Sequence, residues 1–206
     1  MTRRWIIIGV VLVVAVVALG VPLALIAYRQ QSAPAVVDGL APSAVPDVRA
    51  FQLTDQHGQP FGTAQLHGKV ALIYFGYTFC PDICPTELGY VAKVMRGLGS
   101  DSDQIVPVFI SVDPERDSQQ VLAEYVPLFD PRLIGLRGTP AEIDAVATAY
   151  GVMHQKTQVV TKQTGYYLID HTSTIFVLDR MGRIADTLDS DTSVPVAVAR
   201  LRRLLK

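Results

Sequence analysis

The two cysteines of this chain, the only ones it has, lie four positions apart at Cys80 and Cys84. They fall where an unbroken apolar run, residues 70–75, gives way to apolar residues at helical spacing. The run is typical of a strand buried on both faces, and Pro85 suits the first turn of a helix. With a turn between them, both sulfurs can converge on one point, which would be a disulfide or a soft metal ion. Two unrelated buried cysteines are the less favoured interpretation, because such residues rarely come as a pair flanked by prolines at a strand-to-helix junction.

The position of Cys84 has a consequence for its reactivity. A helix N-terminus carries roughly half a positive charge, which stabilises a thiolate. We therefore expect Cys84, at or next to the helix N-cap, to ionise more easily than a free thiol. Cys80 precedes Pro81, which favours an extended backbone at that residue.

A third ligand would come from a histidine. His57 and His67 lie in turn-like segments and are expected to be solvated, and His154 lies in a predicted hairpin. His171 differs because it follows Asp170 and lies just before an apolar strand, residues 174–178. In a thioredoxin-like sheet the loop that enters this strand faces the cysteine loop. Two sulfurs and an imidazole suit copper in either oxidation state, whereas zinc would usually need a fourth protein ligand or a catalytic water.

The order of the predicted elements indicates an α/β protein. Strands alternate with helices until a hairpin and a final helix, which predicts a central, partly parallel sheet. A cysteine pair between an early central strand and its helix is the thioredoxin-like arrangement, and the alternation over residues 152–168 around Thr164 and Gly165 predicts a β-hairpin insertion. The expected strands are 48–53, 70–75, 105–112, 133–136, 174–178 and 184–188, and the expected helices are 86–98, 118–129, one opening at a Thr139–Glu142 capping box, and one after Ser193.

The N-terminal segment predicts a membrane anchor. Residues 5–28 carry no charge, and as a helix they would span about 36 Å against a hydrocarbon core of about 30 Å. Arg3 and Arg4 precede this segment, which places the N-terminus in the cytoplasm by the positive-inside rule. A cleaved signal peptide is the alternative, but its apolar core would be shorter. We therefore predict an anchor over 1–29, a proline-containing linker over 30–47 and a domain over 48–206 that lies outside the cytoplasm.

The charge balance gives no reason to expect a nucleic-acid partner. The chain has 18 basic and 19 acidic residues, for a formal net charge of −1 at pH 7. A protein that binds nucleic acid usually carries a basic patch or stripe, and none is evident here.

The sequence resembles the Sco/SenC family of membrane-anchored copper proteins from Val48 onward, and it shares the anchor. The resemblance implies the metal ligands Cys80, Cys84 and His171, and it places Asp113 and Asp170 near the site, although Asp113 could equally serve to end a strand. Phe79 departs from the family, in which many members have a histidine directly before the first cysteine. The segments that carry the resemblance are YFGYTFCPDICPTEL at 74–88, SVDPERD at 111–117 and DHT at 170–172.

The resemblance implies a copper metallochaperone that helps to assemble the dinuclear copper centre of cytochrome c oxidase subunit II. The cargo would be Cu(I), Cu(II) or both. The expected partners are subunit II and other copper chaperones, and the expected location is the inner membrane, with a single span and the domain facing the periplasm or its equivalent. This is not an enzymatic function, although a thiol–disulfide oxidoreductase activity stays open.

Two other functions use the same cysteines. A thiol–disulfide reductase that keeps the oxidase cysteines reduced would need Cys80 and Cys84 but not His171, and a copper or redox sensor would bind without delivery. The reductase is weakened by the spacing, which is one residue longer than Cys-x-x-Cys, and by the lack of any proline over residues 152–194, where disulfide exchangers place a cis-proline. A peroxidase and a structural zinc site are less favoured.

Overall fold

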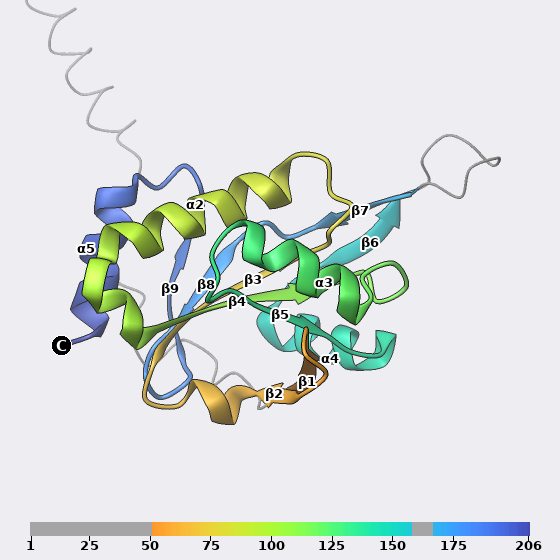
Figure 1. The fold of residues 1–206 in the computed structure, drawn as a ribbon, viewed down its shortest axis with the longest axis horizontal. Helices are drawn as coiled ribbons and strands as arrows, with labels where there is room; N and C mark the ends of the chain where they lie inside the picture. The colour runs from red at the N-terminus through yellow and green to blue at the C-terminus, as the bar shows by residue number, and fades with distance from the viewer. Residues whose placement is uncertain (1–50, 158–166) are drawn as a thin grey trace, which may run out of the picture. The chain divides into compact units, whose positions relative to one another are not determined.

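The computed structural model of the chain describes residues 51–157 and 167–206 (Figure 1). The predicted anchor over 1–29 and linker over 30–47 lie outside these residues. Among the helices that are described, none is long and apolar enough to cross a membrane. The anchor therefore stays a prediction.

A seven-stranded sheet forms the centre of the domain, in the order β2-β1-β5-β4-β3-β8-β9. The middle strands β3, β4 and β5 are parallel, and the strands that flank them are antiparallel to their neighbours. This is the partly parallel α/β sheet that the sequence predicts. The strands are β1 Gln52–Asp55, β2 Pro60–Gly62, β3 Val70–Gly76, β4 Ile105–Ser111, β5 Ile134–Arg137, β8 Ile175–Leu178 and β9 Ile184–Leu188.

Helices cover both faces of the sheet, which explains why every residue of β3 is buried. The ring of Tyr74 packs on Phe109 of β4, and Phe109 in turn contacts Tyr125, so this face lies under α3. The next residue, Phe75, points to the opposite face and contacts Tyr150 at the end of α4. Figure 1 shows α2 and α3 on the near side of the sheet. The helices are α2 Ile83–Leu98, α3 Gln119–Tyr125, α4 Pro140–Tyr150 and α5 Val194–Leu204, with 3₁₀ turns at η2 Thr63–Leu66, η3 Gly99–Gln104 and η4 Val126–Leu128.

Two helix boundaries differ from the prediction. The α2 helix begins at Ile83, three residues earlier than predicted, so Cys84 lies within its first turn. The helix predicted over 118–129 ends as α3 at Tyr125 and continues as the 3₁₀ turn η4, because Pro127 has no N–H to donate to the carbonyl one turn back. The predicted capping box of α4 is confirmed, since Thr139 Oγ1 accepts from the Glu142 N–H and the Glu142 carboxylate accepts from the Thr139 N–H.

A separate two-stranded sheet carries the predicted histidine. Strand β6, His154–Thr157, pairs antiparallel with β7, Leu168–His171. A hairpin is present, but its second strand covers 168–171 and not the residues before 168 as predicted over 152–168, so His171 ends a strand and does not lie in a loop. The connection, 158–166, lies outside the described residues. Strand β7 leads within a few residues into β8, which runs antiparallel to β3 with Ile175 opposite Tyr74. The start of β8 therefore lies beside the end of β3.

Candidate metal centre

Three predicted ligands meet at this end of the sheet. The ligand atoms of Cys80, Cys84 and His171 all lie within 4.8 Å of one another, and the Sγ of Cys84 is 3.2 Å from the Nε2 of His171. Both cysteines are unbonded thiols, 8% and 0% exposed. In the part of the chain that the structure describes, no other three histidine, cysteine or acidic side chains are grouped in this way.

The cysteine loop has a backbone that brings the two sulfurs together. The Cys80 N–H donates to the Tyr77 carbonyl oxygen at 3.3 Å, which folds the loop back on the end of β3. The Cys84 N–H then donates to the Cys80 Sγ at 3.3 Å. Gly76 makes room beneath them, since a Cβ at this residue would lie 3.1 Å from the Cys84 Sγ and 2.9 Å from the Phe109 ring.

His171 presents a lone pair to the sulfurs. Its Nδ1 is 3.0 Å from the carbonyl oxygen of Thr172. A carbonyl oxygen can only accept, so Nδ1 carries the hydrogen and Nε2 has the lone pair that faces Cys84. Burial is the largest effect and lowers the pKa of His171; the hydrogen bond with Thr172 raises it, and the smaller effects of His154, which lowers it, and Asp170, which raises it, follow. The ring is therefore neutral at neutral pH, as a metal ligand must be.

The prediction that Cys84 ionises more easily than a free thiol is wrong. Burial is the main effect and raises the pKa of Cys84 well above its ordinary value, and the hydrogen bond with Cys80 raises it further. The partial charge of the α2 N-terminus is too small to offset the loss of water around a thiol that is 0% exposed. A cation held between two such sulfurs would supply the missing positive charge, so the donor set fits a soft or borderline metal ion.

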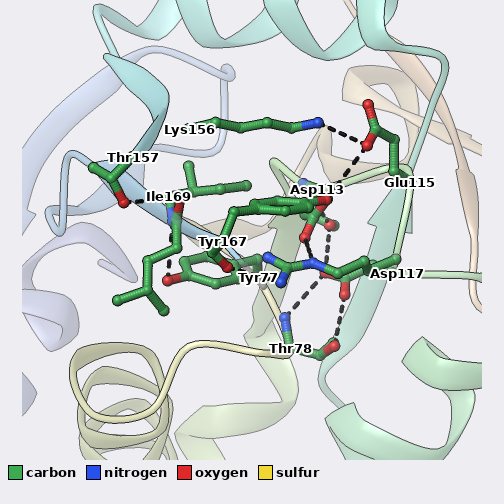
Figure 2. A network of polar contacts seen from close by, with 12 residues as sticks. Tyr77, Thr78, Asp113, Glu115, Asp117, Lys156, Thr157, Tyr167 and Ile169 are labelled. Carbon is green, nitrogen blue, oxygen red and sulfur yellow. Dashed lines mark hydrogen bonds and ion pairs between the residues drawn. The ribbon is translucent and has the colours of Figure 1, made fainter. Parts of the chain in front are cut away.

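Asp113 and Asp170 lie near the centre but do not belong to the group of three. Asp113 is buried, forms an ion pair with Arg116 and accepts a 2.7 Å hydrogen bond from the Tyr167 hydroxyl. Asp170 is exposed and lies one residue from His171, on a strand whose side chains alternate between faces. Figure 2 shows Asp113 beside Tyr167, in a network that borders the cysteine loop.

The structure also shows a residue that the sequence analysis did not single out. Asp117 is fully buried and accepts hydrogen bonds from the Thr78 N–H at 3.0 Å, the Thr78 hydroxyl at 2.6 Å and the Ser111 hydroxyl at 2.5 Å (Figure 2). Asp117 thus joins Thr78, which lies in the cysteine loop two residues before Cys80, to Ser111 at the end of β4. Its presence in the shared segment 111–117 was the available signal, but a lone aspartate after a strand does not by itself indicate a distant partner.

A groove beside the hairpin reaches His171, although neither cysteine lines it. It encloses about 720 Å³ and includes His171 in its wall. Its other lining residues come from α4, from both strands of the small sheet and from the residues next to these strands, and they include Asp144, Met153, His154 and Asp170. His154 is held by Asp144, with 3.1 Å between Nε2 and Oδ1.

The fold is thioredoxin-like, and its cysteine pair faces a neutral histidine. The chain is therefore a metal-binding member of the thioredoxin-like class. The model of the SCO1/SenC family matches residues 42–206, which is most of the length of this chain. The chain therefore belongs to the SCO1/SenC family.

Known relatives agree with this assignment. The chain is 40% identical over 133 residues to the SCO2-like protein RP587 of Rickettsia prowazekii, an alignment that covers 65% of this chain and 64% of that relative's length. Among solved structures, ScoI of Bradyrhizobium japonicum with copper bound has a TM-score of 0.72 at 44% identity, covering 78% of this chain and 100% of that chain. ScoI of Arabidopsis thaliana with copper bound has a TM-score of 0.71 at 35% identity, covering 78% and 98%.

Proposed function

We propose that this protein is a membrane-anchored copper metallochaperone that binds one copper ion through Cys80, Cys84 and His171. The observation that carries the proposal is the convergence of two sulfurs and a neutral imidazole nitrogen within 4.8 Å. Thiolates select soft Cu(I), and imidazole suits either oxidation state of copper. The similar ScoI structures with copper bound support the choice of metal.

Delivery would proceed by ligand exchange at the groove. His171 lies in the groove wall and is only half-buried, whereas Cys84 is fully buried. An incoming partner ligand would therefore displace His171 first, and the two cysteines would be released last. Copper then passes from one set of protein ligands to another without becoming free. Oxidation of both thiols to a Cys80–Cys84 disulfide would remove the thiolate ligands and switch binding off.

Family membership supports a client in cytochrome c oxidase assembly, and the N-terminal segment supports the proposed location. We propose that the recipient is the dinuclear copper centre of cytochrome c oxidase subunit II, and that other copper chaperones supply the ion. The uncharged residues 5–28 would hold the protein in the inner membrane by a single span, with the domain in the periplasm or its equivalent.

A thiol–disulfide reductase for the oxidase cysteines is the second candidate. The proximity of the two sulfurs permits it, because a dithiol that becomes a disulfide passes two electrons and two protons to the disulfide of a client. The raised pKa of Cys84 makes it a poor attacking thiol, so in this candidate the more exposed Cys80 would have to attack the client. The reductase also gives no role to His171.

Copper titration of the full-length protein, in a mild detergent, reduced and free of oxygen, separates the two functions. We expect one tightly bound Cu(I) in competition with a colorimetric chelator. The His171→Ala variant should bind more weakly, by more than the roughly 10- to 100-fold typical of outer residues of a metal site, and the Cys80→Ala/Cys84→Ala variant should not bind. The exposed His57→Ala serves as the matched control. Weak binding by the wild type, or affinity indifferent to His171, would exclude the chaperone and favour the reductase.

A further inference from the structure

Arg116 is held in a single orientation by two residues. It lies in the loop between β4 and α3, where its Nε pairs with the buried carboxylate of Asp113. Its Nη1 donates to the Tyr167 carbonyl oxygen at 2.8 Å, and the Tyr167 hydroxyl donates to the Asp113 Oδ1 at 2.7 Å. The three residues form a closed ring of charge-assisted contacts, which restricts the guanidinium to one plane.

The same guanidinium touches the segments on both sides of the metal centre. Its carbon lies 3.6 Å from the ring centroid of Tyr167, 4.9 Å from that of Phe79 and 5.6 Å from that of Tyr77, all within the range of cation–π attraction. Phe79 directly precedes Cys80. Tyr167 directly precedes β7, which ends at His171. One side chain therefore bridges the cysteine loop and the strand that supplies the histidine.

Among the described residues, the strand that carries His171 also meets the cysteine loop directly, since the His171 ring lies 5.8 Å from the Tyr77 ring between centroids and its Nε2 lies 3.2 Å from the Cys84 Sγ. Strands β6 and β7 form a sheet of their own and share no hydrogen-bonded ladder with the seven-stranded sheet. The Ile169 N–H donates to the Tyr77 hydroxyl at 3.2 Å, which is one attachment. The ion pair of Lys156 with Glu115 joins β6 to the loop between β4 and α3, not to the cysteine loop, and it contributes little because both side chains are about half exposed. The Arg116 side chain is only 17% exposed.

We propose that Arg116 is a positioning residue for the metal centre, which sets the approach of His171 to the two cysteines by joining Tyr167 to Phe79. The inference rests on the proposed copper binding and assigns a role to Asp113, which acts on the centre through Arg116. It also assigns a role to Phe79, whose aromatic ring contacts the guanidinium.

The test is a double-variant cycle on Cu(I) affinity, measured with the full-length protein in competition with bathocuproine disulfonate. Arg116→Gln should weaken Cu(I) binding about tenfold, as expected for a residue that orients a metal ligand. In a His171→Ala background the same change should have an effect of less than about twofold, because the histidine that it positions is gone. Arg116→Lys keeps the charge but not the planar fork, so its affinity should lie between those of the wild type and Arg116→Gln.

Arg183→Gln is the control, because Arg183 also pairs with a nearby aspartate, donating from Nε and Nη2 to the Asp179 Oδ2 at the other end of β8. Its affinity should equal that of the wild type. Two results would overturn the inference: an Arg116→Gln affinity equal to the control's, or a loss of the same size with and without His171. If Arg116→Gln does not fold, Arg116→Lys carries the same cycle. Failure of the wild type to bind Cu(I) would instead reject the proposed function, so the two failures are distinguishable.

Discussion

The Nε2 of His171 lies 3.2 Å from the Sγ of Cys84, although 87 positions separate the two residues along the chain. The antiparallel pairing of β3 with β8 produces this contact. The cysteine loop leaves the end of β3, and His171 comes just before β8 begins at the same end of the sheet. The meeting of His171 with the cysteines is thus a consequence of the pairing of β3 with β8.

Gly76→Ala should distort the metal centre, because Gly76 packs closely against the Cys84 sulfur. The added Cβ would lie 2.9 Å from the rings of both Tyr74 and Phe109 and 3.1 Å from the Cys84 Sγ, so buried groups must shift. We expect a loss of about 1–3 kcal/mol in the free energy of unfolding, measured by urea denaturation, together with weaker Cu(I) binding. Gly89→Ala is the matched control, because a Cβ at this position in α2 would meet nothing within 4 Å. That change should be neutral or slightly stabilising. Equal stability of the two variants would contradict the prediction.

Asp117→Asn should loosen the cysteine loop. The carboxylate accepts three hydrogen bonds, two at Oδ2 from the Thr78 N–H and the Ser111 hydroxyl and one at Oδ1 from the Thr78 hydroxyl. An asparagine keeps one acceptor oxygen but places an NH2 donor where the other oxygen was, so at least one of these bonds is lost or reversed. This mismatch in a buried site should cost about 1–3 kcal/mol in the free energy of unfolding. Asp103→Asn, at an exposed position, tests the same change without buried partners and should have almost no effect. Similar unfolding curves for both variants would mean that Asp117 does not fix the loop.

Much of the fold could be predicted from the sequence because the pattern of apolar residues directly encodes burial. The uninterrupted run at β3 requires cover on both faces, and Pro85 and the capping box at Thr139 indicate where helices begin. The ligand group could be predicted as well, because a thioredoxin-like order of elements brings the segment before β8 to the cysteine loop, and the family resemblance implies the same three residues.

The electrostatics of the centre could not be predicted in the same way. The position of Cys84 near a helix N-terminus indicates a stabilised thiolate, but the pKa depends on how completely the sheet and α2 exclude water. Likewise, the contact of Arg116 with Tyr167 joins residues 51 positions apart, through a hairpin whose docking has no sequence signature.

The metal-free protein should lose stability in mild acid because of His171. Burial lowers the folded-state pKa of His171 below the unfolded value of about 6.5. The unfolded chain therefore binds more protons than the folded protein once the pH falls below about 6.5. The contribution of a neutral His171 is fully present above that pH and is lost as the pH falls towards the folded-state pKa. His171→Gln should flatten this part of the curve of unfolding free energy against pH. An unchanged slope would show that His171 is not buried in its neutral form.

Alkylation of the reduced, metal-free protein should distinguish the two cysteines. Cys80 is 8% exposed, whereas Cys84 is 0% exposed and its pKa is raised by burial, so its thiolate is both scarce and inaccessible. We expect iodoacetamide to modify Cys80 first, and Cys84 only as fast as the loop opens, with the order read by peptide mass spectrometry. In denaturant the two should react at similar rates, which controls for the local sequence. Faster modification of Cys84 in the folded protein would mean that the helix N-terminus outweighs burial after all, and it would strengthen the case for a disulfide reductase in which Cys84 attacks the client.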